Sequence, residues 1–178
     1  MRIFTAIALL VFVSGCANKK DVKLPPAPAS TDAIVKTVKG KKYKATDLAL
    51  ISNLAADKND PYEWFDDIKD TTAFFRNNEK EKKKLEIEFV NDTTAEVTDA
   101  SGTNKAIWSI DDQPKGDEKT GNFLRLTMER EESLFPGQVG KATITFSYKI
   151  LGIDDKQLFL ETPNMFNMKK VAALMKTE

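Results

Sequence analysis

The chain contains one thiol and no imidazole, which limits the chemistry that its side chains can do. Cys16 is the single cysteine among 178 residues, and histidine is absent from the composition. A lone cysteine cannot form an internal disulfide, and without histidine neither a Ser-His-Asp triad nor a Cys-His pair can be built. Zinc would have carboxylates alone as ligands, which rarely suffice. The sequence therefore predicts that the protein is not an enzyme and holds no metal or diffusible cofactor.

Cys16 stands directly behind an apolar run and ahead of two lysines. Residues 3–13 are apolar after a basic Arg2, a length typical of a signal-peptide core and too short to span a bilayer. Residues 13–16, Val-Ser-Gly-Cys, resemble a bacterial lipobox, in which small residues precede a cysteine that is acylated. The resemblance implies a signal peptide over residues 1–15, with a diacylglycerol and an N-acyl chain on Cys16. There are two alternatives: an ordinary secretory signal with a chance cysteine near the cleavage site, or a transmembrane anchor.

Three acyl chains on one residue would hold the protein at a membrane, because stable anchoring needs only two lipid signals. Ala17 follows the cysteine where an aspartate would favour retention in the inner membrane. Residues 17–21 also lack an acidic cluster of the kind that marks export to the cell surface. The resemblance therefore implies an outer-membrane lipoprotein of the bacterial envelope that faces the periplasm.

The next segment is short of large apolar groups. Residues 16–32 contain Pro25, Pro26 and Pro28, which favour an extended, semi-rigid tether between the lipid and the folded part. Residues 33–178 have the length and apolar content of one domain. The charges balance, with 27 basic and 27 acidic residues, so the chain has no electrostatic footprint for nucleic acid.

Most of this domain alternates between apolar and polar residues with period two, which predicts half-buried strands. The clearest case is the stretch 141–151, KATITFSYKIL, where Phe146 and Tyr148 share one face with three smaller apolar residues. Short polar turns separate the strands, so successive strands are expected to pair as antiparallel hairpins. About eight strands in this order predict a mainly β protein, an up-and-down barrel without exposed edges.

One segment breaks this rhythm. In the stretch 60–78, Asp60 and Pro61 suit a helix start, and Phe65, Ile68 and Phe75 fall on one stripe. We expect a helix of about four turns after the first strand. It would cover an open barrel end with aromatic side chains or act as a lid over a ligand. The charged run 79–84, EKEKKK, is interpreted as a solvated helix end or loop, with contact to anionic lipid as the alternative.

The pattern resembles lipocalin-like, or calycin-type, lipoproteins of Gram-negative bacteria over most of residues 39–176. Residues 40–43, Gly-Lys-Lys-Tyr, resemble the Gly-x-Trp element that opens the first lipocalin strand, with Tyr for Trp and one extra residue. Residues 85–111 resemble the family's run of strand, turn, strand, turn and Trp-bearing strand. Residues 146–163 resemble its penultimate hairpin.

This resemblance implies that the barrel interior either binds a small hydrophobic molecule or is filled by its own side chains. The interior of an eight-stranded barrel is just wide enough for its own side chains or for one small ligand. The residues expected to line such a site, in the interior and at the mouth, are Trp64, Phe65, Phe89, Trp108, Phe146 and Tyr148.

Two functions from different classes follow from the sequence. The first is a lipid-anchored barrel that binds and carries a small hydrophobic ligand within the envelope. The second is a non-catalytic interaction protein that docks onto an envelope machine, such as a secretion or assembly complex. Exposure of Ile107, Phe123 and Phe159 on the outer faces of the strands would favour docking, because monomers rarely expose contiguous apolar patches.

Overall fold

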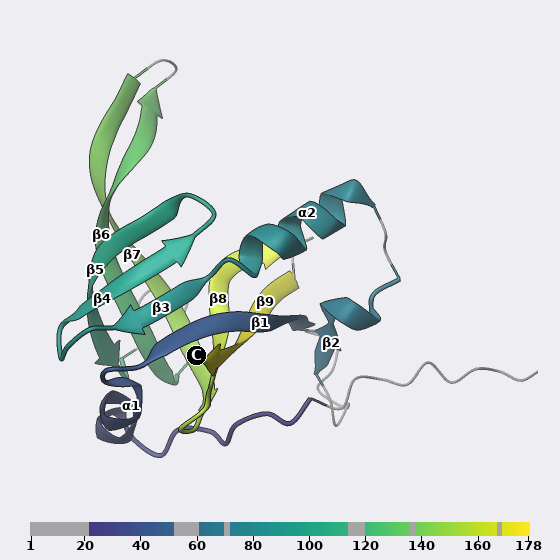
Figure 1. The fold of residues 1–178 in the computed structure, drawn as a ribbon, viewed down its shortest axis with the longest axis vertical. Coiled ribbons are helices and arrows are strands. Elements are labelled where there is room, and N and C mark those ends of the chain that lie inside the picture. Colours follow the sequence, from purple (N-terminus) through teal and green to yellow (C-terminus); the bar gives the residue numbers. More distant parts are fainter. Residues whose placement is uncertain (1–21, 52–60, 70–71, 114–119, 136–137, 167–168) are drawn as a thin grey trace, which may run out of the picture.

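The computed structural model describes residues 22–51, 61–69, 72–113, 120–135, 138–166 and 169–178. Strands dominate the described chain, and from β3 to β9 their order in the sheet follows the sequence (Figure 1). The elements are α1 (Thr31–Val38), β1 (Lys42–Ile51), β2 (Tyr62–Trp64), the 3₁₀ turn η1 (Phe65–Asp67), α2 (Ala73–Lys82), β3 (Glu86–Phe89), β4 (Thr94–Asp99), β5 (Gly102–Asp111), β6 (Asn122–Phe135), β7 (Gln138–Ile153), β8 (Gln157–Phe166) and β9 (Lys169–Thr177).

The sheet closes into an eight-stranded antiparallel barrel, which confirms the predicted fold class. Each strand from β3 to β9 pairs with its neighbour in sequence, and β9 returns to pair with β1 from Thr177 opposite Tyr43 to Lys170 opposite Ile51. On the edge of β1 that faces away from β9, the first three residues pair with β3 and the last three pair with the short β2. Closure removes the unpaired edges that an open sheet would leave.

The predicted alternation sets the interior of the barrel. Apolar residues at alternate positions of the strands form one buried cluster, including Ile87 on β3, Leu126 on β6 and Leu160 on β8. At one end of the barrel this core is filled by three aromatic rings. Phe89 meets Tyr43 and Trp108 edge to face, with ring centroids 6.1 and 5.0 Å apart. Trp108 donates its indole N–H to the carbonyl of Asn91 at 2.8 Å.

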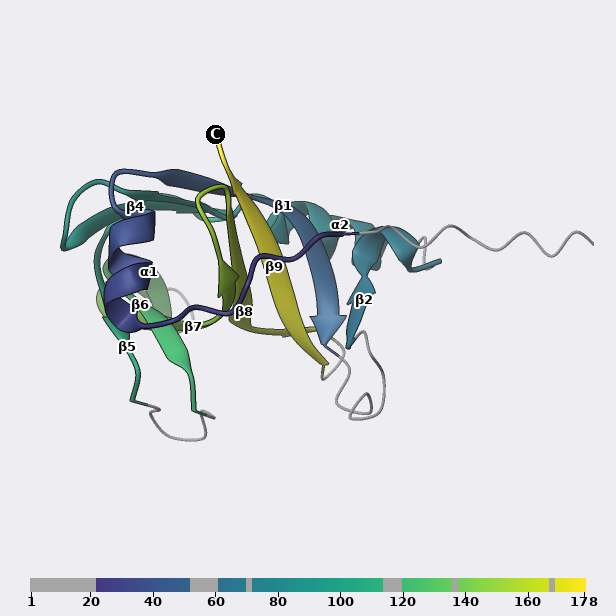
Figure 2. The ribbon, with the colours of Figure 1, turned by 90° about the horizontal axis from the view of Figure 1, so that it is seen from below.

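Helix α1 packs at this filled end, which we call the α1 end (Figures 1 and 2). Ser30 caps the helix by accepting a hydrogen bond from the Ala33 N–H, and Ile34 and Val38, one turn apart, are buried in the main core. The composition of residues 16–32 predicts a tether that includes residues 31 and 32, so helix α1 corrects that prediction. The short motif Ser-Thr-Asp is a capping signal that the proline-rich composition before it obscured.

The helix predicted over residues 60–78 is wrong in position. Asp60 lies outside the described residues, and the chain from Tyr62 to Trp64 forms β2 instead. Helix α2 begins after Thr72, whose hydroxyl accepts the Phe75 N–H at 3.3 Å. Pairing with β1 overrides the local helix signal, because it buries Trp64 on the outer surface of the barrel. Helix α2 then crosses the opposite end of the barrel, the α2 end, with Phe75 buried in the core (Figure 1).

A second apolar cluster lies on the outer surface of the barrel. It joins Trp64 of β2 with Phe159 of β8 and Leu174 of β9, and the rings of Trp64 and Phe159 are 6.2 Å apart. Val22 and Leu24 of the N-terminal segment pack against it. Residues 22–30, which we call the strap, therefore lie along the barrel wall (Figure 2). This differs from the predicted semi-rigid tether between the lipid and the folded part, and residues 16–21 of that segment lie outside the described residues.

The hairpin of β6 and β7 extends well beyond the barrel wall (Figure 1). The two strands pair from Asn122 opposite Ile150 to Phe135 opposite Gln138, so most of the turn predicted over residues 135–141 is strand. Within the described residues, no helix is long and apolar enough to cross a membrane.

Candidate functional site

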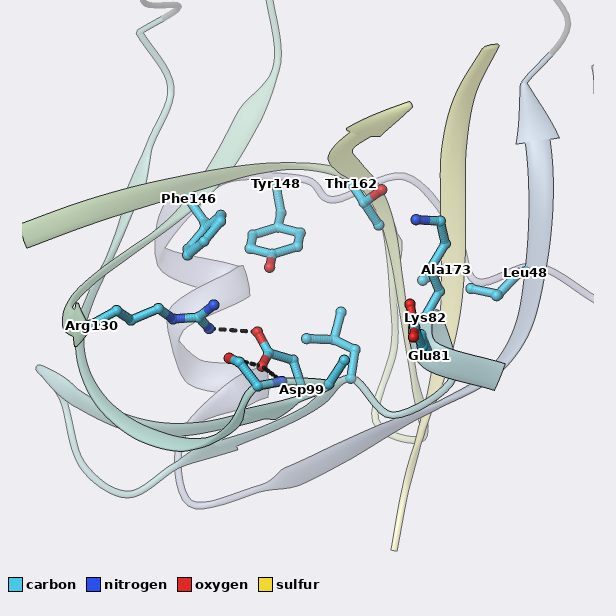
Figure 3. Close-up of a pocket in the computed structure, with 12 residues that line it drawn as sticks. Leu48, Glu81, Lys82, Asp99, Arg130, Phe146, Tyr148, Thr162 and Ala173 are labelled. Atoms are coloured by element: carbon cyan, nitrogen blue, oxygen red, sulfur yellow. Dashed lines mark hydrogen bonds and ion pairs between the residues drawn. The ribbon is translucent and has the colours of Figure 1, made fainter. Parts of the chain in front are cut away.

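A pocket of about 290 Å³ lies at the α2 end of the barrel (Figure 3). Its floor and walls are apolar side chains that face inward from the strands, including Leu48, Phe146 and Ala173. Its polar groups come from the last turn of α2, the turn between β4 and β5, and the inner row of β6. The volume is close to the lower limit of about 300 Å³ for small-molecule sites, and it suits a molecule of about ten non-hydrogen atoms at about 30 Å³ each.

Two charged side chains meet on the wall of the pocket. Arg130 donates from Nη2 to the Asp99 carboxylate at 2.5 Å, and its guanidinium lies 4.9 Å from the centroid of the Phe146 ring. Both residues continue inward-facing rows, Asp99 after Val97 on β4 and Arg130 after Met128 on β6. The alternation in the sequence assigns Asp99 and Arg130 to the interior face of their strands. Their charge, at the ends of the apolar rows, favours a position in solvent, so neither residue is predicted as part of the site. The pair places a neutralised but strongly polar surface inside the barrel.

The Asp99 carboxyl has a pKa below its ordinary value of 3.8. Burial alone would raise the pKa, but hydrogen bonds from Ser101 and Arg130 to the charged form outweigh it. Because the pKa is lower in the folded state, this carboxylate stabilises the fold above the ordinary carboxyl pKa. The stabilisation is lost as the pH falls through the folded-state pKa.

We therefore expect Asp99→Asn to lower the free energy of unfolding more near pH 7 than near pH 3. Urea unfolding of wild type and variant at the two pH values measures this difference. Asp92→Asn is the matched control, since Asp92 forms an exposed ion pair with Lys39 at 2.6 Å, and exposed pairs contribute little at either pH. A loss for Asp99→Asn that does not change with pH would contradict this account of the pair.

Tyr148 presents its hydroxyl to the pocket. The residue is only 7 % exposed, and its ring lies beside Phe146 on β7. Figure 3 shows the hydroxyl pointing into the space above Arg130 and Asp99. Among the described residues this hydroxyl has no hydrogen-bond partner. Burial, with a smaller effect from the charge of Asp99, raises the pKa of Tyr148 to about 12, so the group stays protonated and can donate at neutral pH.

Lys82 brings a positive charge to the rim of the pocket from the last turn of α2. Burial lowers the pKa of its ammonium, and Glu81 opposes this effect. Lys82 forms no ion pair with any residue of the described ranges. Together with Tyr148 and Arg130, it gives the pocket three hydrogen-bond donors above an apolar floor, an arrangement that suits an amphipathic molecule with an accepting or anionic head.

The residues predicted to line a ligand site are divided by the structure. Phe146 and Tyr148 line the pocket. Phe89 and Trp108 face the interior, but they pack against each other at the α1 end. In that part of the barrel the interior is filled by the protein's own side chains. Phe65 is buried against Phe75, with centroids 5.0 Å apart, and contributes no pocket surface.

The remaining predicted residues lie elsewhere. Trp64 is on the outer surface of the barrel, so its placement at the mouth is wrong, because β2 turns the side chain toward Phe159. Cys16 lies outside the described residues, and its lipidation stays a prediction.

The residues proposed to mark a docking surface also differ from one another. Ile107 is 65 % exposed, whereas Phe123 and Phe159 are 3 % and 1 % exposed. The Arg125 guanidinium covers Phe123 at 4.9 Å from the ring centroid, and the outer cluster covers Phe159. Ile107 and the half-exposed Val90 line an outer groove of about 700 Å³ across β4, β5, β6 and β7.

In the described part of the chain, no three acidic, cysteine or histidine side chains gather as metal ligands. The fold and the site thus define a closed antiparallel barrel with an amphipathic pocket at its α2 end. Comparisons of the chain with protein-family models, curated proteins and solved structures found no match. Membership of the lipocalin-like family stays a prediction of the sequence.

Proposed function

We propose that this protein is a lipoprotein of the bacterial cell envelope whose lipocalin-like barrel binds a small amphipathic molecule in the pocket at the α2 end. The lipobox-like residues 13–16 support the anchor, a diacylglycerol and an N-acyl chain on Cys16 in the outer membrane. The pocket supports the binding function. The protein acts by holding its ligand and needs no catalytic group.

The observation that carries this proposal is the Tyr148 hydroxyl, which stays protonated, faces the open space of the pocket and forms no hydrogen bond with a described residue. A hydroxyl that lines an apolar pocket is available to donate a hydrogen bond to an accepting group of a ligand. The apolar floor at Leu48 and Ala173 would hold a short hydrocarbon chain. The donors Lys82, Arg130 and Tyr148 would hold a carboxylate or another accepting head.

The first test is the binding of octanoate by the full mature protein, measured by titration calorimetry, with octylamine as the cationic control. We expect octanoate to bind and octylamine not to bind. Tyr148→Phe should weaken octanoate binding about two- to tenfold, the effect of losing one hydrogen bond of about 0.5–1.5 kcal/mol. The same variant should leave the free energy of unfolding unchanged, because no described residue bonds to the hydroxyl.

A second candidate function is docking onto an envelope complex, and the exposed Ile107 and Val90 in the outer groove favour it. Isolated monomers expose such side chains singly, but here both line one concave surface. If octanoate and lipid extract both fail to bind or to raise the melting temperature, the binding proposal is wrong and docking becomes the better account.

A further inference from the structure

The strap is held to the barrel by both backbone and side-chain contacts. The Ile153 N–H donates to the carbonyl of Pro26 at 2.9 Å, at the end of β7. Pro25 is buried, and Val22 and Leu24 pack into the outer apolar cluster. The strap is therefore part of the folded domain and is not a free stalk.

Gly152 provides the space that the strap occupies. A Cβ atom built at this position would lie 2.4 Å from the carbonyl oxygen of Pro25, which is closer than real contacts allow. The register of β7 against β8 shifts between Ile150 and Gly152, so the strand is irregular where the strap crosses it. A side chain at residue 152 would push the strap away from the barrel wall.

The strap runs from the α2 end toward the α1 end. Val22 and Leu24 pack against the outer cluster, as do Ile51 and Tyr62 at the α2 ends of β1 and β2, whereas Ser30 caps α1 at the other end. Figures 1 and 2 both show the strap passing from the side of β2 to α1. Val22, the first described residue, therefore lies toward the end that holds the pocket.

The link from this point to Cys16 is short. Five residues lie between Cys16 and Val22, and the six fully extended steps from one to the other reach about 20 Å. If residues 22–30 were free, as in a stalk, they would add about 30 Å and allow any orientation of the barrel. With the strap docked, the α1 end would stand beyond this reach, because the ten residues of β1 alone span about 33 Å.

The α2 end also carries charge that suits a bacterial membrane. Residues 73–84 contain five basic and two acidic side chains, and Lys80 and Lys84 are exposed. The acidic η1 lies at the same end, and its Asp66 is paired with Lys83 at 3.5 Å. Basic residues close to an anionic leaflet are attracted to it within about 10 Å, the range of the screened field.

We propose that the docked strap holds the α2 end of the barrel, and with it the pocket, against the anionic lipid surface to which Cys16 is attached. The proposal rests on the lipid anchor of the proposed function. It deepens that function, because a pocket that faces the bilayer can exchange an amphipathic ligand directly with the membrane.

The test places a fluorescent label at each end of the lipidated protein on vesicles of phosphatidylethanolamine and phosphatidylglycerol. Lys80→Cys labels the α2 end and Lys156→Cys labels the α1 end. Both replace an exposed lysine that forms no ion pair with a described residue. Quenching by spin-labelled lipid headgroups should be several-fold stronger at position 80. Equal quenching, or stronger quenching at position 156, would overturn the proposal.

Release of the strap gives the second arm of the test. Gly152→Leu is added to each of the two labelled variants. It should make the quenching at positions 80 and 156 similar while the protein stays bound to the vesicles. Leu24→Ser loosens the strap without a clash and should act in the same direction, which covers the case that Gly152→Leu fails to fold. A difference between the labels that persists after the strap is released would show that the strap does not set the orientation.

Failure of the anchor would be seen separately. The parent protein has no thiol besides Cys16, so a lipidated sample takes up no maleimide label. Labelling of the parent, together with protein that does not sediment with vesicles, would refute the anchor itself. Equal quenching of membrane-bound protein would refute the orientation alone.

Discussion

Phe159→Ala is expected to lower the free energy of unfolding by about 3–5 kcal/mol, the range for truncating a buried aromatic residue. Phe159 is 1 % exposed although its side chain points away from the barrel interior. Its ring meets Tyr62 edge to face at 5.0 Å and lies 6.2 Å from Trp64. The substitution removes the centre of the outer cluster, so β2 and the strap should loosen together. Urea unfolding followed by far-ultraviolet circular dichroism measures the loss.

Ile107→Ala is the matched control for this prediction. The sequence pattern assigns Ile107 and Phe159 to the same kind of position, an outward-facing site on a strand. Ile107 is 65 % exposed, so its truncation should change stability by about 0.5 kcal/mol or less. Similar losses for the two variants would mean that the outer cluster does not stabilise the fold.

Hydrophobic alternation predicted the barrel well because the interior of a closed sheet requires it on every strand. The inner rows at Leu124 and Leu126, and at Leu158 and Leu160, are buried as expected. The same rule assigns Phe159 to solvent, which is wrong. A second layer covers it, and that layer consists of the strap and β2, two short segments whose sequences carry no periodic signal. Period two therefore identifies the face of a strand but does not show what packs on its outer side.

The candidate site was predicted in part, for a related reason. Phe146 and Tyr148 were assigned to the interior and do line the pocket. Phe89 and Trp108 were assigned to the same face, but alternation does not give the height of a residue along the barrel, and they fill the other end. Lys82 could not be placed, because the predicted helix began about one dozen residues too early, at Asp60 in place of Thr72.

The α1 end and the α2 end of the barrel differ in what their side chains do. At the α1 end, the rings of Tyr43, Phe89 and Trp108 pack against one another, and the helix α1 covers them. At the α2 end, Arg130 and Asp99 face the interior, and their polar groups keep apolar side chains from closing the space. Ligand binding should therefore depend on the α2 end, whereas the aromatic core of the α1 end should affect stability alone. Substitutions at the two ends should separate these properties.

Trp108→Ala tests this separation and should cost about 3–5 kcal/mol of unfolding free energy. Trp108 is 3 % exposed, packs against Phe89 at 5.0 Å and donates to the Asn91 carbonyl. Its loss leaves a cavity at the α1 end and an unpaired carbonyl. The protein that remains folded should bind octanoate with unchanged affinity, because Trp108 does not line the pocket.

Trp108→Phe is the graded control for this last prediction. It keeps an aromatic ring against Phe89 but loses the hydrogen bond to Asn91, so its cost should be clearly smaller than that of Trp108→Ala. Tyr148→Phe should show the opposite profile, with weaker octanoate binding and unchanged stability. If folded Trp108→Ala lost octanoate binding, the ligand would have to reach the α1 end, and the division of the barrel into a structural end and a binding end would be wrong.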